Sequence, residues 1–302
     1  MNKYLISILG PTAIGKTKLA IELAEKYSTE IISADSRQFY NELNIGAAKP
    51  SQKDLNKVKH HLINNKSVID NYSIGEFERD AIKNITKIHE KIDIAILVGG
   101  SGLYLDVINY GLDQVPKSDE NIRNILNNEF KIKGLHHIQN ELKKKDLISF
   151  NNIDLNNHRR IIRALEVTIS SGKPYSSFLK KKNTRRNFKT IEIGLKGDRE
   201  LIYNRINTRV DKMIEDGLVS EVNGLAQHKE LNSLNTIGYK EIFNYLQGKS
   251  DLDNAIDEIK KNTRRYAKRQ MTWFNSNNNI IWFKVNYKIE DIIKCIDDLI
   301  SH

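Results

Sequence analysis

GPTAIGKT, at residues 10–17, decides the fold of this 302-residue chain. It follows an apolar run at 3–9, KYLISIL, and precedes helical periodicity from Lys16 to about Tyr27. A strand, a turn and a helix around G-x-x-x-x-G-K-[ST] indicate a P-loop, whose glycines let consecutive N–H groups point at phosphate oxygens. Lys16 would neutralise phosphate charge, and the Thr17 hydroxyl would hold Mg²⁺. The predicted diphosphate-binding residues of this loop are Gly10, Pro11, Thr12, Ala13, Ile14, Gly15, Lys16 and Thr17.

Further apolar runs predict that the P-loop belongs to a parallel sheet. They are unbroken rather than alternating, and helical patterns separate them, as in parallel strands that helices cover on both faces. We therefore expect an α/β protein with a P-loop NTPase-like parallel sheet flanked by helices. Besides 3–9, the predicted strands are 30–34 (EIISA), 92–98 (IDIAILV), 190–195 (TIEIGL) and 280–285 (IIWFKV).

The middle of the chain differs in character from this core. Helical periodicity dominates residues 113–189 and basic residues cluster there, which predicts a helical insertion domain. The core domain would then comprise 1–112 and 190–302, with mostly helical structure near its C-terminal end. The charged stretch KKKNTRRN, at 180–187, is expected to be a mobile connector.

Charge and composition limit the class of partner. The net charge is +10, the pI is about 9.3 and the mean hydropathy is −0.53, which favours a soluble protein with an acidic partner, nucleic acid first. The chain is also rich in Lys, Asn and Ile, as an AT-biased genome would produce, so total charge alone does not decide. No apolar run approaches the roughly 20 residues of a membrane helix. With no evident signal peptide and one cysteine, Cys295, we expect a cytoplasmic protein without membrane, disulfide or zinc.

The segment 259–274 separates basic from apolar residues on a predicted helix. At about 100° per residue, the two kinds fall on opposite halves. No acidic residue occurs from 260 to 274, so the basic half offers a surface to a phosphate backbone, while the apolar half would pack on the core. The basic half contains Lys260, Lys261, Arg264, Arg265, Lys268 and Arg269, and the apolar half contains Ile259, Tyr266, Ala267, Met271, Trp273 and Phe274.

A carboxylate at a strand end narrows the chemistry. Asp35 follows the second predicted strand, whereas the third ends in Val98, Gly99 and Gly100. A nucleotide hydrolase or kinase usually carries a magnesium-binding Asp after such a strand. The P-loop alone is compatible with ATP, GTP or another diphosphate compound, and Asp35 is placed to face an acceptor substrate across the phosphates.

Ten more sequence blocks, in order, span nearly the whole chain. They are DSRQFY (35–40), IGAAKP (45–50), HHL (60–62), YSIGEFERDA (72–81), VGGSGLY (98–104), RIIRALEV (160–167), SGKPYS (171–176), RINTRVDKMIEDGLVSEV (205–222), IGYKE (237–241) and TRRYAKRQMTWF (263–274). With these blocks and the P-loop, the chain resembles the bacterial tRNA dimethylallyltransferases, also called tRNA isopentenyltransferases. The resemblance implies an enzyme that transfers a dimethylallyl group from dimethylallyl diphosphate to N6 of the adenosine 3′ of the anticodon, with Mg²⁺.

The resemblance also implies roles for individual side chains. Asp35 would be the general base, because an exocyclic amine is a poor nucleophile that must lose its proton as the bond forms. Arg209 would stabilise the departing diphosphate together with the P-loop, and Ser101 would complete the catalytic set. The expected tRNA contacts are Asp35, Ser36, Arg37, Gln38, Ser101, Arg123, Arg159, Arg160, Ile161, Ile162, Arg163, Arg264 and Lys268, with Gln38 suited to reading the edge of a flipped base.

The chain departs from the family pattern at several positions. Ser101 stands where the family usually has Thr, which keeps the hydroxyl and loses a methyl group. Ala47 replaces a Thr near the site, and Asn275 replaces an Arg. None of these departures falls on the P-loop or on Asp35.

Three other functions remain open from the sequence. An adenylate isopentenyltransferase would use the same chemistry on a free nucleotide, but it would not need the basic helix and the arginines of the insertion. A small-molecule kinase lacks support because no Asp follows Gly100. A non-enzymatic RNA-binding module would leave the P-loop unexplained. We expect a monomer whose partners are the tRNA anticodon stem-loop and dimethylallyl diphosphate.

Overall fold

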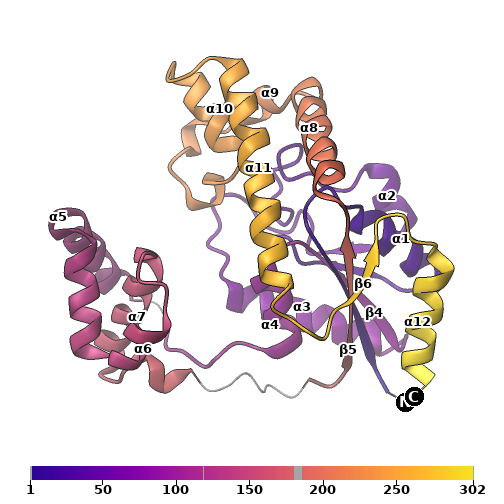
Figure 1. Ribbon diagram of the computed structural model, residues 1–302, viewed down its shortest axis with the longest axis horizontal. Coiled ribbons are helices and arrows are strands. Elements are labelled where there is room, and N and C mark those ends of the chain that lie inside the picture. The colour runs from indigo at the N-terminus through magenta and orange to yellow at the C-terminus, as the bar shows by residue number, and fades with distance from the viewer. Residues whose placement is uncertain (1, 118, 180–185, 302) are drawn as a thin grey trace. The chain divides into compact units, whose positions relative to one another are not determined.

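The computed structural model describes residues 2–117, 119–179 and 186–301, and Figure 1 shows its elements. The chain divides into two compact units. The core unit comprises 1–109 and 186–302, and the insertion unit comprises 110–185.

The insertion unit ends earlier than the predicted 113–189. Residues 186–189 belong to the core, because the Arg186 guanidinium donates to the Ile108 carbonyl at 2.9 Å and the strand β5 begins at Lys189. Residues 180–185, which make up most of the predicted connector, lie outside the described residues.

The core unit contains a parallel six-stranded sheet in the order β3-β2-β4-β1-β5-β6. The unbroken apolar runs become its strands, and β1 lies between β4 and β5, where Ile8 pairs with Val98 on one side and Ile193 on the other. The two-residue strand β3 was not predicted, because its polar sequence carries no strand pattern. The strands are β1 Tyr4–Leu9, β2 Ile31–Ser33, β3 His60–His61, β4 Ile94–Val98, β5 Lys189–Lys196 and β6 Ile281–Lys284.

Helices cover both faces of this sheet, as the buried apolar strands require (Figure 1). One face carries α1 (Lys16–Lys26) and α12 (Ile289–Ser301), whose buried apolar residues join the main core. The other carries α3 (Ile74–His89) and α4 (Gly102–Tyr110). A short helix, α2 (Gln52–Lys57), precedes β3.

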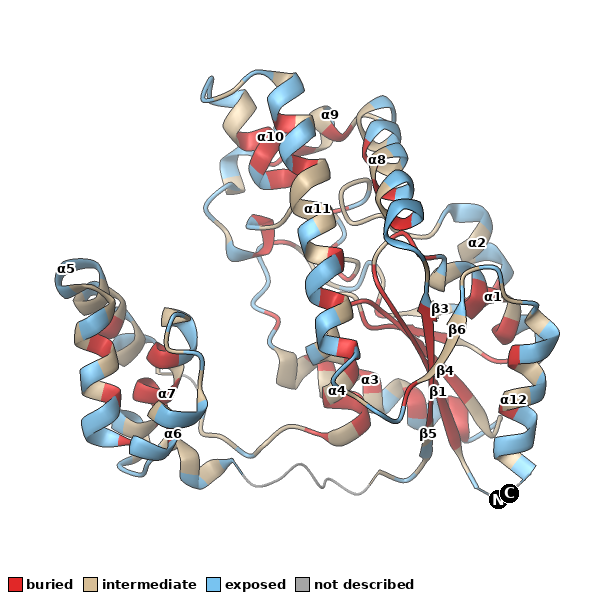
Figure 2. Cartoon of the chain, in the orientation of Figure 1, coloured by how far each residue is buried: buried red, intermediate tan, exposed pale blue. Residues whose placement is uncertain are grey.

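The C-terminal helices of the core unit surround the ends of the strands at which the P-loop lies (Figure 1). The long helix α11 buries Ile259, Ala267, Gln270 and Phe274, which recur at helical spacing on one face (Figure 2). Asp251 caps its N-terminus by accepting from the Asn254 N–H at 2.8 Å. These helices are α8 Arg199–Glu215, α9 Leu218–Asn223, α10 Tyr239–Leu246 and α11 Leu252–Phe274.

The insertion unit is helical and has a small apolar core of its own, as its periodicity predicted. Leu126 and Leu142 of α5 pack there with Leu165 of α7. Gly134 interrupts α5 with a φ of +79°, in the left-handed region that favours glycine. Its helices are α5 Glu120–Lys145, α6 Leu147–Asn152 and α7 His158–Ser171. Across the described part of both units, no helix is long and apolar enough to cross a membrane.

Candidate functional site

The P-loop connects β1 to α1 with the backbone that its glycines allow. Gly10 has φ +142° and Gly15 has φ +106°. A Cβ on Gly10 would also lie 2.6 Å from the Leu195 carbonyl oxygen, so a side chain is excluded for two reasons. Gly15 caps α1 without a side-chain hydrogen bond, so the first N–H groups of the helix are left to bind an anion.

Lys16 extends back along this loop. Its Nζ donates to the Pro11 carbonyl at 2.8 Å. The pKa of Lys16 is lowered to about 7, mainly by desolvation and also by nearby Arg209, while the charge of Asp35 acts in the opposite direction. An incoming diphosphate would restore the charge of the ammonium group, since an anion favours the charged form.

Asp35 follows β2 and faces this lysine. Its carboxylate accepts from the Arg37 N–H at 2.9 Å. Desolvation raises the pKa of Asp35, although this hydrogen bond and the charges of Lys16 and Arg37 oppose the increase. A carboxylate with a raised pKa is a stronger base, as proton abstraction from an amine requires.

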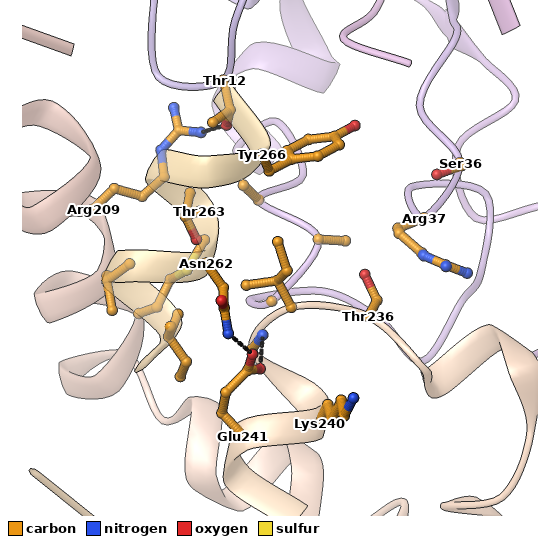
Figure 3. A pocket seen from close by; sticks show the side chains of 18 of the residues that line it. Thr12, Ser36, Arg37, Arg209, Thr236, Lys240, Glu241, Asn262, Thr263 and Tyr266 are labelled. Carbon is orange, nitrogen blue, oxygen red and sulfur yellow. Dashed lines mark hydrogen bonds between the residues drawn. The ribbon is translucent and has the colours of Figure 1, made fainter. Parts of the chain in front are cut away.

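Arg209 approaches the P-loop from α8, as Figure 3 shows. Its guanidinium donates to the Thr12 hydroxyl at 3.2 Å, and one helical turn earlier Arg205 donates to the Ile14 carbonyl, also at 3.2 Å. Desolvation lowers the pKa of Arg209, but the side chain remains a cation at neutral pH. The structure thus brings Arg209 to the loop, although about 190 residues separate them in sequence.

Two residues of α11, Tyr266 and Gln270, complete the wall of the site. The side chain of Tyr266 is hydrogen-bonded to that of Ser101, and desolvation raises the pKa of Tyr266. The Gln270 amide accepts from the Thr12 N–H at 2.9 Å and donates to the Gly100 carbonyl at 2.7 Å. The sequence alone did not single out Gln270. The signal was its position three residues after Ala267, on the apolar half of the helix, because a buried polar side chain is normally hydrogen-bonded inside the fold.

Two cavities meet at these residues. One, of about 310 Å³, is lined by the P-loop and contains Lys16 and Thr17 in its wall. The other, of about 510 Å³, opens among α8, α10 and α11. Both are lined by Thr12, Asp35, Ala47, Ala48, Arg209 and Tyr266. A molecule whose phosphates occupied the first cavity would therefore present its reacting carbon near Asp35.

The donor set suits Mg²⁺ bound together with phosphates. Thr17 lies in the wall of the 310 Å³ cavity, where its hydroxyl is a possible ligand. Among the described residues, no group of three or more His, Cys, Asp or Glu could hold a metal ion. An ion here would then take most of its ligands from substrate phosphates and water, as Mg²⁺ commonly does.

Ser36, Arg37 and Gln38 follow Asp35, but the structure uses two of these side chains to hold the chain itself. Arg37 donates to the Ser233 carbonyl at 3.1 Å. The Gln38 amide accepts from the Ser33 hydroxyl at 2.9 Å and donates to the carbonyls of Ala47 and Ala48. Reading a base edge through the Gln38 N–H groups, as expected, would require them to leave these two carbonyls.

In the insertion unit, two of the predicted RNA-contacting arginines share one buried carboxylate. Glu166, which is fully buried, accepts from Arg123 at 2.7 Å and from Arg163 at 3.0 Å. Arg163 also donates to the Pro116 carbonyl at 2.8 Å. These contacts assign both arginines a structural part, while Arg159 and Arg160 are exposed at the start of α7.

Two of the residues predicted to contact tRNA are buried. Ile161 is 0% exposed and Ile162 is 4% exposed, because both pack in the core of the insertion unit. Their side chains have no surface to offer to RNA, so a contact of either residue with tRNA would have to come from its backbone.

The basic half of α11 is less uniform than the sequence indicated. Lys260 pairs with Asp211 of α8, and Arg264 donates to Asn207 of the same helix at 2.8 Å. Lys268 and Arg269 are exposed further along. The neighbouring helix thus supplies one acidic partner, Asp211, and one amide partner, Asn207, and no linear pattern reveals these contacts.

The parallel sheet, the P-loop at the end of β1 and the basic side chains around it define a P-loop α/β protein whose P-loop cavity adjoins a second cavity. The model of the IPP transferase family matches residues 38–277. The chain belongs to the IPP transferase family.

Individual relatives agree with this assignment. A tRNA dimethylallyltransferase of Christiangramia forsetii is 50% identical, with the whole of both chains covered. The crystal structure of a tRNA isopentenylpyrophosphate transferase from Bacillus halodurans has a TM-score of 0.72 and 37% identity, and the match covers 100% of this chain and 96% of that one. A eukaryotic dimethylallyltransferase described as acting on tRNA has a TM-score of 0.85 at 27% identity, with 99% of this chain and 80% of that one covered.

Proposed function

We propose that this chain is a tRNA dimethylallyltransferase that transfers the dimethylallyl group of dimethylallyl diphosphate to N6 of the adenosine 3′-adjacent to the anticodon. The main supporting observation is the position of Asp35 in the wall of both the phosphate cavity and its neighbour. The names of the relatives and the family match support the same activity.

The proposed chemistry uses the two cavities together. The adenine N6 attacks C1 of the dimethylallyl group, the C1–O bond breaks, and the electron pair leaves with diphosphate. Asp35 takes the N6 proton as the N–C bond forms. The P-loop N–H groups, Lys16 and Arg209 stabilise the charge that grows on the leaving oxygen. Mg²⁺, held with Thr17 as a ligand, would neutralise part of the same charge.

The RNA-binding part of the proposal rests on exposed cations. Arg159, Arg160 and Lys268 are free of a core role in the structure and would meet the phosphate backbone. Ser36, Arg37, Ser101 and Arg264 remain proposed contacts nearer the reacting base. Arg123 and Arg163 would act on RNA through the surface that their pairing with Glu166 holds in shape.

One assay tests substrate and reaction together. The purified protein is incubated with Mg²⁺, labelled dimethylallyl diphosphate and either an anticodon stem-loop or AMP, and the nucleosides are analysed by mass. We expect label on N6 of the stem-loop adenosine only. Label on AMP alone would instead indicate an adenylate isopentenyltransferase, and phosphate transfer from ATP without prenylation would indicate a kinase.

We also propose that the protein acts as a monomer in the cytoplasm. Its target would be tRNA, and a chain with the single cysteine Cys295 suits a reducing compartment. Light scattering on the purified protein, with and without the stem-loop, tests the monomer: a dimeric mass contradicts it.

A further inference from the structure

We infer that Glu221 of α9 is a positioning residue for the donor site, which fixes the loop 44–48 as a wall of both cavities. One oxygen of its carboxylate accepts from the N–H groups of Asn44 at 3.1 Å and Ile45 at 2.7 Å. The other accepts from the Gly46 N–H at 3.1 Å. One charged group thus holds three consecutive backbone amides.

These amides belong to a loop that has little structure of its own. Residues 45–48 form a single turn, in which the Ala48 N–H donates to the Ile45 carbonyl at 2.9 Å, and Ala48 has φ +48°. A turn with a non-glycine residue in the left-handed region is strained and persists only where its surroundings hold it. Hydrogen bonds to an ionised acceptor are about twice as strong as neutral ones, so Glu221 supplies the main restraint from this side.

Tyr239 reinforces the same contact. Its hydroxyl donates to the Glu221 carboxylate, and its ring is fully buried. A Cβ on Gly46 would lie 2.4 Å from this ring, so the loop backbone lies directly against the ring. From the opposite side, the Gln38 amide donates to the carbonyls of Ala47 and Ala48. The loop is therefore held between α9 and the chain that follows β2.

The position of this loop sets the width of the donor site. Ala47 and Ala48 line both cavities, opposite the P-loop residue Thr12, and Gly46 lines the larger one. Small side chains there leave room for a short branched hydrocarbon. This inference rests on the proposed function: if an allylic diphosphate occupies the site, Glu221 determines how tightly a five-carbon chain fits and how well a longer chain is excluded.

Glu221→Gln tests the restraint, because the amide keeps the size of the side chain but loses its charge and one of its two acceptors. We expect the amides of residues 44–46 to exchange with solvent at least about tenfold faster in the variant, as expected for losing a charge-assisted bond. Hydrogen exchange read by NMR needs no substrate, so this result stands whether or not the protein prenylates tRNA. In the wild type these amides must already exchange slowly; fast exchange there overturns the inference without any variant.

Kinetic measurements distinguish a positioning role of Glu221 from a general effect on protein stability. We expect Glu221→Gln to raise the KM for dimethylallyl diphosphate about tenfold while kcat falls less, and to reduce the preference for dimethylallyl over geranyl diphosphate. Glu221→Asp, which keeps the charge, should recover part of both effects. Glu215→Gln, at the exposed end of α8, is the matched control and should change neither. An unchanged KM and an unchanged preference in folded Glu221→Gln would contradict the inference.

Discussion

At the scale of single residues, the site depends on how burial shifts proton equilibria. Asp35 and Lys16 lie in one cavity, and desolvation favours the neutral form of each. Their mutual attraction opposes that tendency. A diphosphate on the P-loop adds negative charge, which favours the ammonium form of Lys16 and the protonated form of Asp35. In the proposed reaction, donor binding would therefore make the Asp35 carboxylate a stronger base.

Asp35→Ala should abolish turnover without removing RNA binding. We expect kcat to fall by about 10²–10⁴, the usual contribution of a general base. The Kd for the stem-loop should stay within a few-fold, because most of that affinity comes from cations elsewhere on the surface. Single-turnover kinetics and filter binding measure the two quantities. A collapse of RNA affinity would make Asp35 a binding residue instead.

The lowered pKa of Lys16 predicts how donor binding depends on pH. As the pH rises through about 7, the free enzyme loses the Lys16 proton and with it a positive charge beside the diphosphate. The affinity of the wild type for magnesium diphosphate should therefore decrease relative to Lys16→Met, in which this titration is absent. Calorimetry over a pH series measures the ratio of the two Kd values. Diphosphate itself titrates in both experiments, and the ratio cancels this effect. A ratio that is constant with pH contradicts the prediction.

At the scale of elements, α11 both closes the site and carries cations. Its buried side bridges the P-loop to the end of β4 through Gln270, and its exposed side presents Lys268 and Arg269. The helix α8 adds Arg209 to the loop and supplies Asp211 to Lys260. The two helices thus hold Arg209 and Gln270 at the proposed site before a substrate binds.

Gln270→Leu should destabilise the protein and loosen the P-loop. The change leaves the Thr12 N–H and the Gly100 carbonyl without their partner, which costs about 1–3 kcal/mol in the free energy of unfolding. Urea denaturation measures this loss. Gln247→Leu, at the exposed C-terminal end of α10, serves as the control and should stay within about 0.5 kcal/mol of the wild type. Equal stability of the two variants would exclude a role for the Gln270 bridge.

At the scale of the whole molecule, a net charge of +10 indicates how the protein would find RNA. Many of these cations are paired within the fold, as with Lys260, Arg123 and Arg163. The remaining exposed cations produce the long-range attraction that speeds association and weakens with salt.

The logarithm of the binding constant for the stem-loop should therefore decrease linearly with the logarithm of the salt concentration. Each phosphate contact contributes a slope of about 0.7–0.9. The double variant Arg159→Ala, Arg160→Ala should lower the slope by the amount expected for up to two phosphate contacts. Lys87→Ala, at an exposed position of α3, should leave the slope unchanged. Fluorescence anisotropy at several salt concentrations measures the slopes. If the double variant keeps the wild-type slope, the start of α7 does not contact RNA.

The sequence by itself determined the P-loop, the parallel sheet, the family and the position of Asp35 at a strand end. These features depend on consecutive residues or on runs of apolar side chains, so they are readable along the chain. Only the tertiary structure decided the roles of Gln270, Glu221 and Glu166, and the burial of Ile161 and Ile162. Most of their partners lie many residues away or on another element. Whether a polar side chain serves a substrate or the fold depends on what packs beside it, which a linear pattern does not contain.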